Sequence, residues 1–480
     1  MTPSRALDSL RARAGQELVE RIEHLDAVRG TRPIDRALSP PDASARIDAD
    51  VVVAGGGLSL LVAAELARQG VTVLVIERAR AGAAHREWNA SDAELEPLVD
   101  AGIVTREELA ELIVGRYRDG VCAFHGGTPR RVRGVLDRAV DAGPLLARVR
   151  HVAESRGVKF IDGATVDAVG VGESSVRIGY RSGAGGAGLA DEEGEVVARV
   201  LVDARGASSP YASADLVCPT VGGVLRGLRH GDAPHEVDPN VGDILVTTEH
   251  VDAQSGLQHV WEGFPGHPGE VTVYLFYYAR SSSAPPGALA TLYARFFETL
   301  VNYKEGDPEL VRPTFGYIPG WSRLSPAPRA PWQRVVLVGD AAARHSPLTF
   351  CGFGSMLRAF RPAALEIVKA IEEGRAPARD VVPEDPVHMW TGALATVMAS
   401  GALAGPKLNG LLDAAFGVLE EMGNEDFSAL LQDRMDGRRF TEFLRRTGAR
   451  HPIVYREVLR ALGPMSAARW GVRLAREALA

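Results

Sequence analysis

Residues 50–78 read as a short apolar strand, a tight glycine turn, a helix and a second strand, and this order constrains the fold more than any other stretch. The apolar run 51–54 is short and β-branched, which is typical of a strand buried in a parallel sheet. The pattern then predicts a helix from about Leu58 to Arg68. Glycines leave the backbone N–H groups at a helix start uncovered, so the sequence predicts a dinucleotide phosphate site at the three residues between strand and helix: Gly55, Gly56 and Gly57.

The second strand of this unit, at 71–76, ends in an acidic residue. A carboxylate about 20 residues after the glycines is where such folds bind the adenosine ribose, so Glu77 and the adjacent Arg78 are candidate cofactor-binding residues. The third glycine position of the G-x-G-x-x-G pattern is occupied by Leu60, so we expect a slightly displaced helix. An ordinary βαβ unit with a glycine turn is the alternative interpretation.

Composition excludes several classes of protein. A chain of 480 residues is longer than a single hydrophobic core usually stabilises, so several domains are expected. The net charge of −7 and the absence of a long basic run argue against nucleic-acid binding. The three cysteines lie far apart, which predicts neither a disulfide framework nor a metal site and fits a cytoplasmic protein.

The segment 391–407 is the nearest approach to a membrane segment, because it holds no charge until its last residue. No stretch reaches the roughly 20 apolar residues of a spanning helix. The segment is therefore expected to be a buried helix or a helix that touches a membrane surface. The first 45 residues show no secretory signal.

Four regions are expected from changes in pattern along the chain. A charged helical arm covers 1–47, with one charged helix expected over 1–28. A nucleotide-binding α/β domain is discontinuous, at 48–217 and 331–375, and includes a glycine-rich turn at 182–195. Alternating, aromatic-rich segments predict an antiparallel sheet over 218–330, which would form the roof of a substrate cavity. The last region, 376–480, is predicted to be mainly helical.

A second motif follows a buried strand at 334–338, in the stretch VVLVGDAAARHSPLTFCGFGSMLRAF at 335–360. It resembles the second flavin-contact motif of the flavoprotein group that includes hydroxybenzoate-hydroxylase-like monooxygenases, geranylgeranyl reductases and lycopene cyclases. The resemblance implies FAD as cofactor, in a Rossmann-like, glutathione-reductase-like α/β fold. It also implies that Asp340 reaches the ribityl chain, and that a helix start faces the pyrimidine side of the flavin with Gly352, Phe353 and Gly354.

Three further stretches look like the CruA/CruP-type lycopene cyclases: REWN at 86–89, CPTVG at 218–222 and SPLTF at 346–350. The similarity covers about 50–433 and departs from the family pattern at Cys351, where a glycine is expected. It implies a redox-neutral ring closure on a carotenoid or other polyisoprenoid. Without a second cysteine at disulfide spacing, Cys351 is interpreted as a packed small side chain rather than a redox thiol.

Ring closure of that kind needs an acid in a dry pocket, since desolvation keeps a carboxylic acid protonated. Glu262 is the first candidate, because strand alternation places Val260 and Phe264 on its face. Glu87 is the second candidate, although Arg86 beside it suggests an ion pair. His345, close to the flavin motif, is the third. Each also has an ordinary structural interpretation, as a solvated or ion-paired carboxylate or a satisfied turn histidine.

Two other functions fit the same cofactor. One is an oxidoreductase, either a monooxygenase or a reductase, that acts on an apolar substrate and uses NAD(P)H as a transient reductant. The other is a non-catalytic protein that binds a flavin or a lipid. Because an apolar substrate resides in membranes, peripheral membrane association is expected, and the pattern specifies no oligomeric state.

Overall fold

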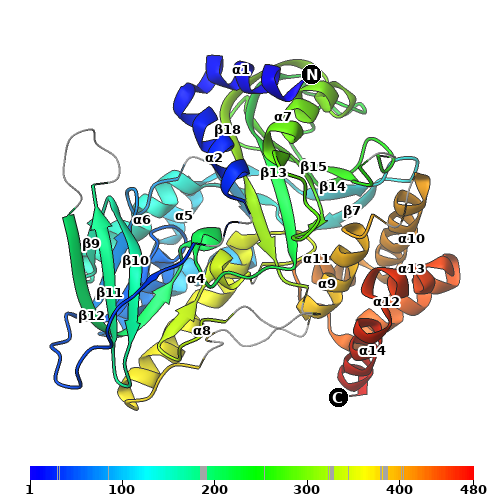
Figure 1. Ribbon diagram of the computed structural model, residues 1–480. Coiled ribbons are helices and arrows are strands. Elements are labelled where there is room, and N and C mark those ends of the chain that lie inside the picture. The colour runs from blue at the N-terminus through cyan, green and yellow to red at the C-terminus, as the bar shows by residue number, and fades with distance from the viewer. Residues whose placement is uncertain are drawn as a thin grey trace.

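The computed structural model describes the 480-residue chain except residues 30, 32, 85, 184–191, 253–254, 323, 325–328, 344, 379–380, 382–386, 402, 404 and 480. For 387–390, 477 and 479 it describes the backbone alone. Most of the glycine-rich turn expected at 182–195 lies outside the described residues. Figure 1 shows a first sheet on the left, a second sheet at the upper right and a helical C-terminal region at the lower right.

The first sheet carries the glycine turn. Its spatial order is β1 (Arg36–Ala37), β10 (Ala164–Val171), β11 (Val176–Ser182), β12 (Glu192–Asp203), β2 (Ala49–Ala54), β3 (Val73–Glu77) and β9 (Lys159–Asp162), and β19 (Val335–Leu337) also pairs with β12. The central strands β12, β2, β3 and β9 run parallel, as expected for a Rossmann-like unit.

Alternation along β2 divides the core of this domain. Val51 and Val53 face helices α3 (Leu60–Arg68), α6 (Ala142–Ser155) and α8 (Gly352–Glu372). Val52 and Ala54 face the opposite side, toward β10 and β11. Two short helices, α4 (Asp92–Asp100) and α5 (Arg106–Leu112), complete the helical layer. The apolar run of β2 is buried on both faces, which explains why it lacks polar alternation.

The second sheet is mainly antiparallel and lies over the end of the first. Its order is β17 (Ala279–Arg280), β13 (Leu216–Leu228), β16 (Val271–Tyr277), β15 (His259–Pro265), β14 (Val241–Val246), β6 (Asp119–Ala123) and β7 (Arg130–Arg133), and β18 (Gly306–Gly320) also pairs with β13. β6 and β7 come from the 48–217 range and extend this sheet. A small third sheet consists of β4 (Glu87–Ala90), β8 (Arg138–Asp141) and β5 (Ile113–Arg116).

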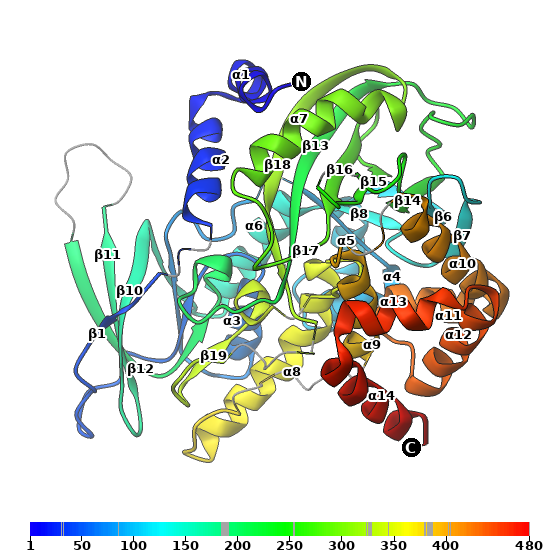
Figure 2. The ribbon, with the colours of Figure 1, turned by 45° about the vertical axis from the view of Figure 1, so that its right-hand side comes forward.

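Helices cover both faces of the second sheet. One face packs against α7 (Ala288–Thr299) and the N-terminal helices α1 (Pro3–Ala14) and α2 (Gln16–Val28), which lie at the top of Figure 2. The sequence suggested one helix over 1–28. The chain turns at Gly15, whose φ of +89° is a backbone conformation that favours glycine, so two helices form instead.

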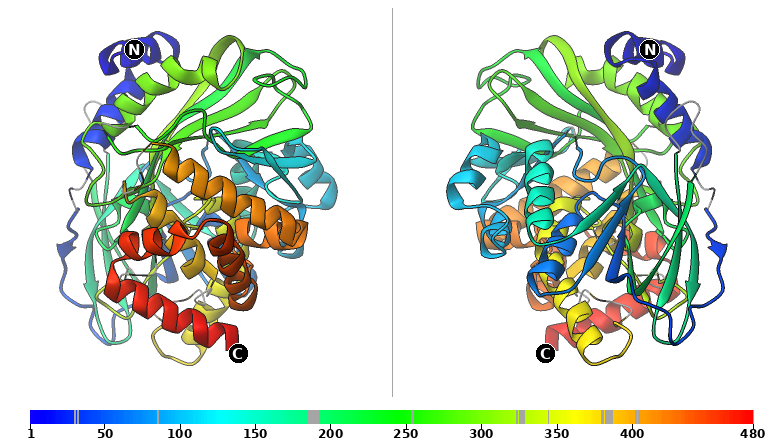
Figure 3. Two further views of the ribbon diagram at one scale, coloured as in Figure 1. Left: turned by 90° about the vertical axis from the view of Figure 1, so that its right-hand side faces the viewer. Right: turned by 90° about the vertical axis from the view of Figure 1, so that its left-hand side faces the viewer.

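The other face of the second sheet meets the C-terminal helices, which Figure 3 shows in front in its left view. These helices are α9 (Val387–Met398), α10 (Pro406–Met422), α11 (Asn424–Leu431), α12 (Gly437–Arg450), α13 (Ile453–Leu462) and α14 (Pro464–Leu479). The apolar segment 391–407 is not one helix: α9 ends at Met398, and α10 begins at Pro406. Among the described residues, no helix has the length and apolar character to cross a bilayer.

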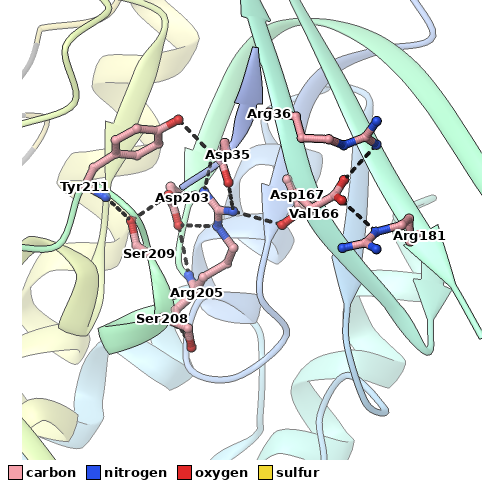
Figure 4. A network of polar contacts seen from close by, with 10 residues as sticks. All are labelled: Asp35, Arg36, Val166, Asp167, Arg181, Asp203, Arg205, Ser208, Ser209 and Tyr211. Atoms are coloured by element: carbon pink, nitrogen blue, oxygen red, sulfur yellow. Dashed lines mark hydrogen bonds and ion pairs between the residues drawn. The ribbon is translucent and has the colours of Figure 1, made fainter. Parts of the chain in front are cut away.

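The expected fold class is confirmed: an α/β nucleotide-binding domain, an antiparallel sheet and a helical C-terminal region. A largely buried arginine, whose side chain is 12% exposed, ties the N-terminal arm to the first sheet (Figure 4). The Arg205 guanidinium donates to Asp203, Asp35 and the Val166 carbonyl over distances of 2.8–3.2 Å. All five guanidinium N–H groups are engaged, and Tyr211 adds a 2.7 Å hydrogen bond to Asp35.

Arg205→Met is expected to lower the free energy of unfolding by about 3–5 kcal/mol, because Asp203 and Asp35 would stay buried without their cation. Urea denaturation measures this loss. As the matched control, Arg177→Met removes a more exposed pair with Glu195 and is expected to cost about 0–1 kcal/mol. Equal losses in the two variants would show that Arg205 does not anchor the arm.

Candidate functional site

The glycine turn lies where parallel strands β2 and β12 end. A Cβ on Gly55, whose φ is +112°, would lie 2.4 Å from the Ala204 carbonyl oxygen. A Cβ on Gly56 would lie 2.5 Å from the Cβ of Ala81. Gly57 differs, because it is exposed and nothing lies within 4 Å of the position that its Cβ would take. The first two glycines therefore permit close backbone packing, and the third borders open space.

Helix α3 begins at Leu60 rather than at Leu58, as the sequence suggested. The backbone first makes tight turns, in which the Leu60 N–H donates to the Gly57 carbonyl at 3.0 Å and the Leu61 N–H to the Leu58 carbonyl at 3.1 Å. Leu60 itself is fully buried in the core of the first domain. The missing third glycine is thus replaced by a core side chain at the first residue of the helix.

Glu77 lies at the end of β3, beside the glycine turn. Its Oε2 accepts a hydrogen bond from the Gly56 N–H at 2.6 Å, and its Oε1 accepts one from the Ala79 N–H at 3.0 Å. Arg78 beside it is exposed. The structure therefore brings Glu77 and the glycines together, and the binding of a ribose there stays a prediction.

Asp340 and the start of α8 are joined by His345. Asp340 lies in a short 3-10 turn, η3 (Gly339–Ala342), and its Oδ1 is 2.9 Å from Nε2 of the buried His345. The imidazole packs against Gly352, where a Cβ would lie 2.9 Å from Nδ1. Desolvation alone would raise the pKa of Asp340, but the charge and hydrogen bond of His345 outweigh it, so that the pKa is lowered.

The first turn of α8 packs against the REWN segment. The Phe353 ring stacks on Trp88 with ring centroids 4.9 Å apart. A Cβ on Gly354 would lie 2.5 Å from a carboxylate oxygen of Glu94, so a side chain here would require the Glu94 carboxylate to shift. The predicted residues Gly352, Phe353 and Gly354 are therefore fixed by neighbours from α4, β4 and the His345 loop. The helix has no side-chain cap among the described residues.

Glu262 lies on the face of the second sheet that points toward α8. The Asn89 amide donates a 2.7 Å hydrogen bond to its Oε1. Val260 and Phe264 are buried on the same face, as the sequence predicted. Desolvation raises the pKa of Glu262 from 4.5 to about 7, and the bond from Asn89 only partly opposes this rise.

A chain of close contacts connects these groups. The Asp340 side chain keeps 50% of its accessible surface, and Glu262, Tyr274 and Cys351 are also partly exposed. Protein atoms nevertheless surround all four closely enough that desolvation is the largest influence on each pKa. Cys351 connects the start of α8 with the second sheet. Its Sγ lies 3.7 Å from the carbonyl oxygen of Asn89, and the Asn89 side-chain amide donates a hydrogen bond to Glu262. The groups thus form one partly exposed cluster between the start of α8 and the second sheet.

Glu87 has a different environment. It is 2% exposed and forms an ion pair with Arg312 of β18, and the Thr272 hydroxyl donates to it at 3.2 Å. Desolvation raises its pKa, and the charge of Arg312 opposes the rise. The partner is Arg312 rather than the neighbouring Arg86. Of the three acid candidates, Glu262 is partly exposed beside Asn89, His345 is buried against Asp340, and Glu87 is held in an ion pair.

Sequence reasoning did not single out Asn89 or Tyr274. Asn89 belongs to the REWN segment, but its contact with Glu262 joins residues far apart in the chain. Tyr274 lies directly opposite Glu262 in the β15–β16 register, and alternation within 270–279 was the available signal. Burial raises the pKa of Cys351 to about 12, which keeps it a thiol and agrees with its interpretation as a packed side chain.

No family model and no curated protein matches the sequence. Solved structures do resemble the fold. A geranylgeranyl bacteriochlorophyll reductase-like protein from Thermoplasma acidophilum matches with a TM-score of 0.60 and 16% identity, over 86% of this chain and 98% of that one. The halogenase PltM in complex with phloroglucinol and FAD matches at 0.56 and 12%, over 88% and 96%. OxyS anhydrotetracycline hydroxylase from Streptomyces rimosus matches at 0.53 and 17%, over 80% and 76%. At these identities, the likeness establishes the fold.

Glu262→Gln is expected to change how stability depends on pH. Between about 4.5 and about 7, the unfolded carboxyl is ionised while the folded one stays protonated, so wild-type stability falls as the pH rises. Gln at 262 keeps an oxygen that accepts the Asn89 hydrogen bond and has no proton to lose.

Relative to the wild type, the free energy of unfolding of the variant should therefore rise across this pH window, by about 3 kcal/mol in total. Urea unfolding at successive pH values measures the difference. A constant difference from pH 4 to 8 would contradict the assigned environment of Glu262.

Proposed function

We propose that the chain binds FAD across the glycine turn and this cluster. The pyrophosphate would lie at the glycine turn, the ribose at Glu77, the ribityl chain at Asp340 and the isoalloxazine at the start of α8. The observation that carries this proposal is the open space around the position that a Cβ of Gly57 would take. The backbone at Gly55 and Gly56, by contrast, is tightly packed. Backbone N–H groups at such a turn accommodate an anionic diphosphate.

The polar atoms around the start of α8 fit such a ligand. The hydroxyls of Thr349 and Ser355 are buried, and neither has a hydrogen-bond partner among the described residues. The Asp340 carboxylate is half exposed at the same place. Bound FAD would supply electron transfer, or a negatively charged ring, at this helix start. The partial positive charge of the α8 N-terminus stabilises negative charge there.

We further propose that the chain is an FAD-dependent enzyme for an apolar substrate, with Glu262 as its proton donor. The same face of the second sheet carries Val260, Phe264 and Phe276, all nearly fully buried, beside the partly exposed Tyr274. With a pKa of about 7, the Glu262 carboxyl is substantially protonated at neutral pH. Such a group can transfer its proton to a carbon–carbon double bond, as long as the pocket stays dry.

Two reactions can follow such a protonation. We propose the first of them, ring closure, as the specific activity of this chain. In ring closure of the CruA/CruP lycopene cyclase type, the protonated polyene cyclises and a neighbouring proton is lost, so the mass is unchanged. In a reductase reaction, a hydride completes the addition of hydrogen, so the mass rises by one H2. The reductase-like and hydroxylase neighbours support the second outcome, or a monooxygenase reaction that adds oxygen.

Product mass separates these reactions. The purified protein is supplied anaerobically with reduced FAD and either lycopene or a geranylgeranyl substrate, and the products are analysed by mass spectrometry. A product of unchanged mass supports ring closure, and a gain of H2 supports reduction. NAD(P)H oxidation coupled to oxygen uptake in air supports a monooxygenase. If FAD is bound but no arm of the experiment yields a product, the enzymatic proposal is overturned. The chain would then be a non-catalytic binding protein.

Gly57→Val is expected to weaken FAD binding strongly while the fold persists. Its Cβ meets no atom within 4 Å, so the apoprotein accepts it, but the side chain would fill the space expected for the diphosphate. The affinity for FAD, measured by quenching of flavin fluorescence, should fall at least about tenfold, a loss of about 1.4 kcal/mol.

Gly410→Val is the matched control, because Gly410 also has open space at its Cβ and lies on α10. It should bind FAD as the wild type does. Wild-type affinity in Gly57→Val would show that the diphosphate does not lie at this turn.

Glu262→Gln is expected to lower turnover by roughly 100-fold or more, within the range for loss of a general acid. Wild-type turnover should fall as the pH rises through about 7, where Glu262 loses its proton. This fall is the alkaline limb of the pH profile, and the variant should lack it. Steady-state kinetics from pH 5 to 9 measure both effects. Glu87→Gln, at the ion-paired carboxyl, should keep the limb. A pH limb that survived in Glu262→Gln would assign the acid to another group.

A further inference from the structure

The C-terminal helices carry a concentration of exposed apolar side chains. Four large apolar residues of α13 and α14 are more than half exposed: Tyr455 (51%), Leu459 (55%), Met465 (75%) and Val472 (56%). Isolated residues of this kind are ordinary on a protein surface, but a group on two adjoining helices indicates an interaction site. Figure 3 shows both helices at the outer side of the C-terminal region in its left view.

Spacing places the exposed residues of α14 in one stripe. Met465, Arg469, Val472 and Arg476 recur at intervals of three and four residues, which is one face of a helix. The opposite face anchors the helix to the protein: Ala467 and Leu474 are each 8% exposed, and Trp470 meets the Phe440 ring of α12 edge to face. The exposed stripe is therefore presented by a helix that is already held in place.

Charge is distributed unevenly along the chain. Residues 434–480 contain eleven arginines and four acidic residues, whereas the whole chain has a net charge of −7. On the exposed stripe itself, Arg469 and Arg476 alternate with Met465 and Val472. A surface that combines arginines with apolar side chains matches the boundary of an anionic bilayer, where headgroups pair with the cations and acyl chains accept the apolar groups.

We propose that this stripe of α14, together with Tyr455 and Leu459 of α13, docks the protein onto an anionic lipid bilayer. Two symmetric copies would bring like-charged arginines together, which disfavours this face as a dimer interface. The stripe replaces the segment 391–407 as the place of membrane contact. That segment packs into the core instead: Thr391 and Ala395 are 0% exposed, and Val397 and Met398 are 5% exposed or less.

Flotation of the full chain with vesicles tests the proposal. The protein should float with vesicles of phosphatidylglycerol and phosphatidylcholine, and much less with phosphatidylcholine alone or in high salt, because salt screens the arginines. Arg469→Gln with Arg476→Gln should lower the partition coefficient by about 25-fold, at roughly fivefold per arginine. Met465→Gln with Val472→Thr should lower it by about fivefold or more.

Matched controls lie elsewhere on the surface. Arg5→Gln with Arg13→Gln removes two exposed arginines of α1, and Ile34→Thr with Val301→Thr removes two apolar side chains that are 88% and 66% exposed. Both pairs should float like the wild type. Circular dichroism checks that every variant is folded.

The proposal is overturned if the wild type fails to bind anionic vesicles or if the α14 variants float as it does. It is also overturned if analytical ultracentrifugation shows that the wild type is a dimer and that those variants are monomers. Gly57→Val should float normally, so failure of the docking surface is distinguishable from failure of the FAD proposal.

Discussion

Close backbone packing at the end of the parallel strands is the constraint on which the rest of the site depends. β2, β3, β12 and β19 all end at one edge of the first sheet. The turn after β2 reaches the end of β12 so closely that Gly55 accepts no Cβ beside Ala204. The parallel strands thus place Glu77, the glycine turn and Asp340 at one edge of the sheet, although 263 positions separate Glu77 from Asp340.

The second sheet supplies an apolar environment beside the start of α8. Its inner face supplies a carboxyl group whose surroundings are apolar enough to raise its pKa to about 7. The single hydrogen bond from Asn89 orients Glu262 without adding a compensating positive charge, unlike the Arg312 ion pair at Glu87. The two carboxyls thus have different surroundings: Glu262 has a neutral hydrogen-bond partner, and Glu87 pairs with a cation.

The sequence was sufficient where the signal is local. The β2–α3–β3 unit, the strand before Asp340 and the alternation around Glu262 each occupy one short stretch, and the structure contains all three. Contacts between distant stretches were not predictable. Asn89 holds Glu262 across 173 positions, and Arg205 reaches Asp35 across 170. β6 and β7 read as part of the first domain, but their register joins them to β14, a pairing that no local pattern specifies.

The buried and exposed apolar segments of the C-terminal region have different physical roles. Residues of α9 pack with Leu348 and Phe350, the loop residues that precede α8, in one hydrophobic cluster with the inner face of the second sheet. This cluster therefore stiffens the loop beneath the predicted flavin position. The stripe on α14 contributes nothing to that core, and burying it in a bilayer would cost no internal contact. A membrane contact there would leave the geometry around Glu262 unchanged, so docking and chemistry can be altered separately by substitution.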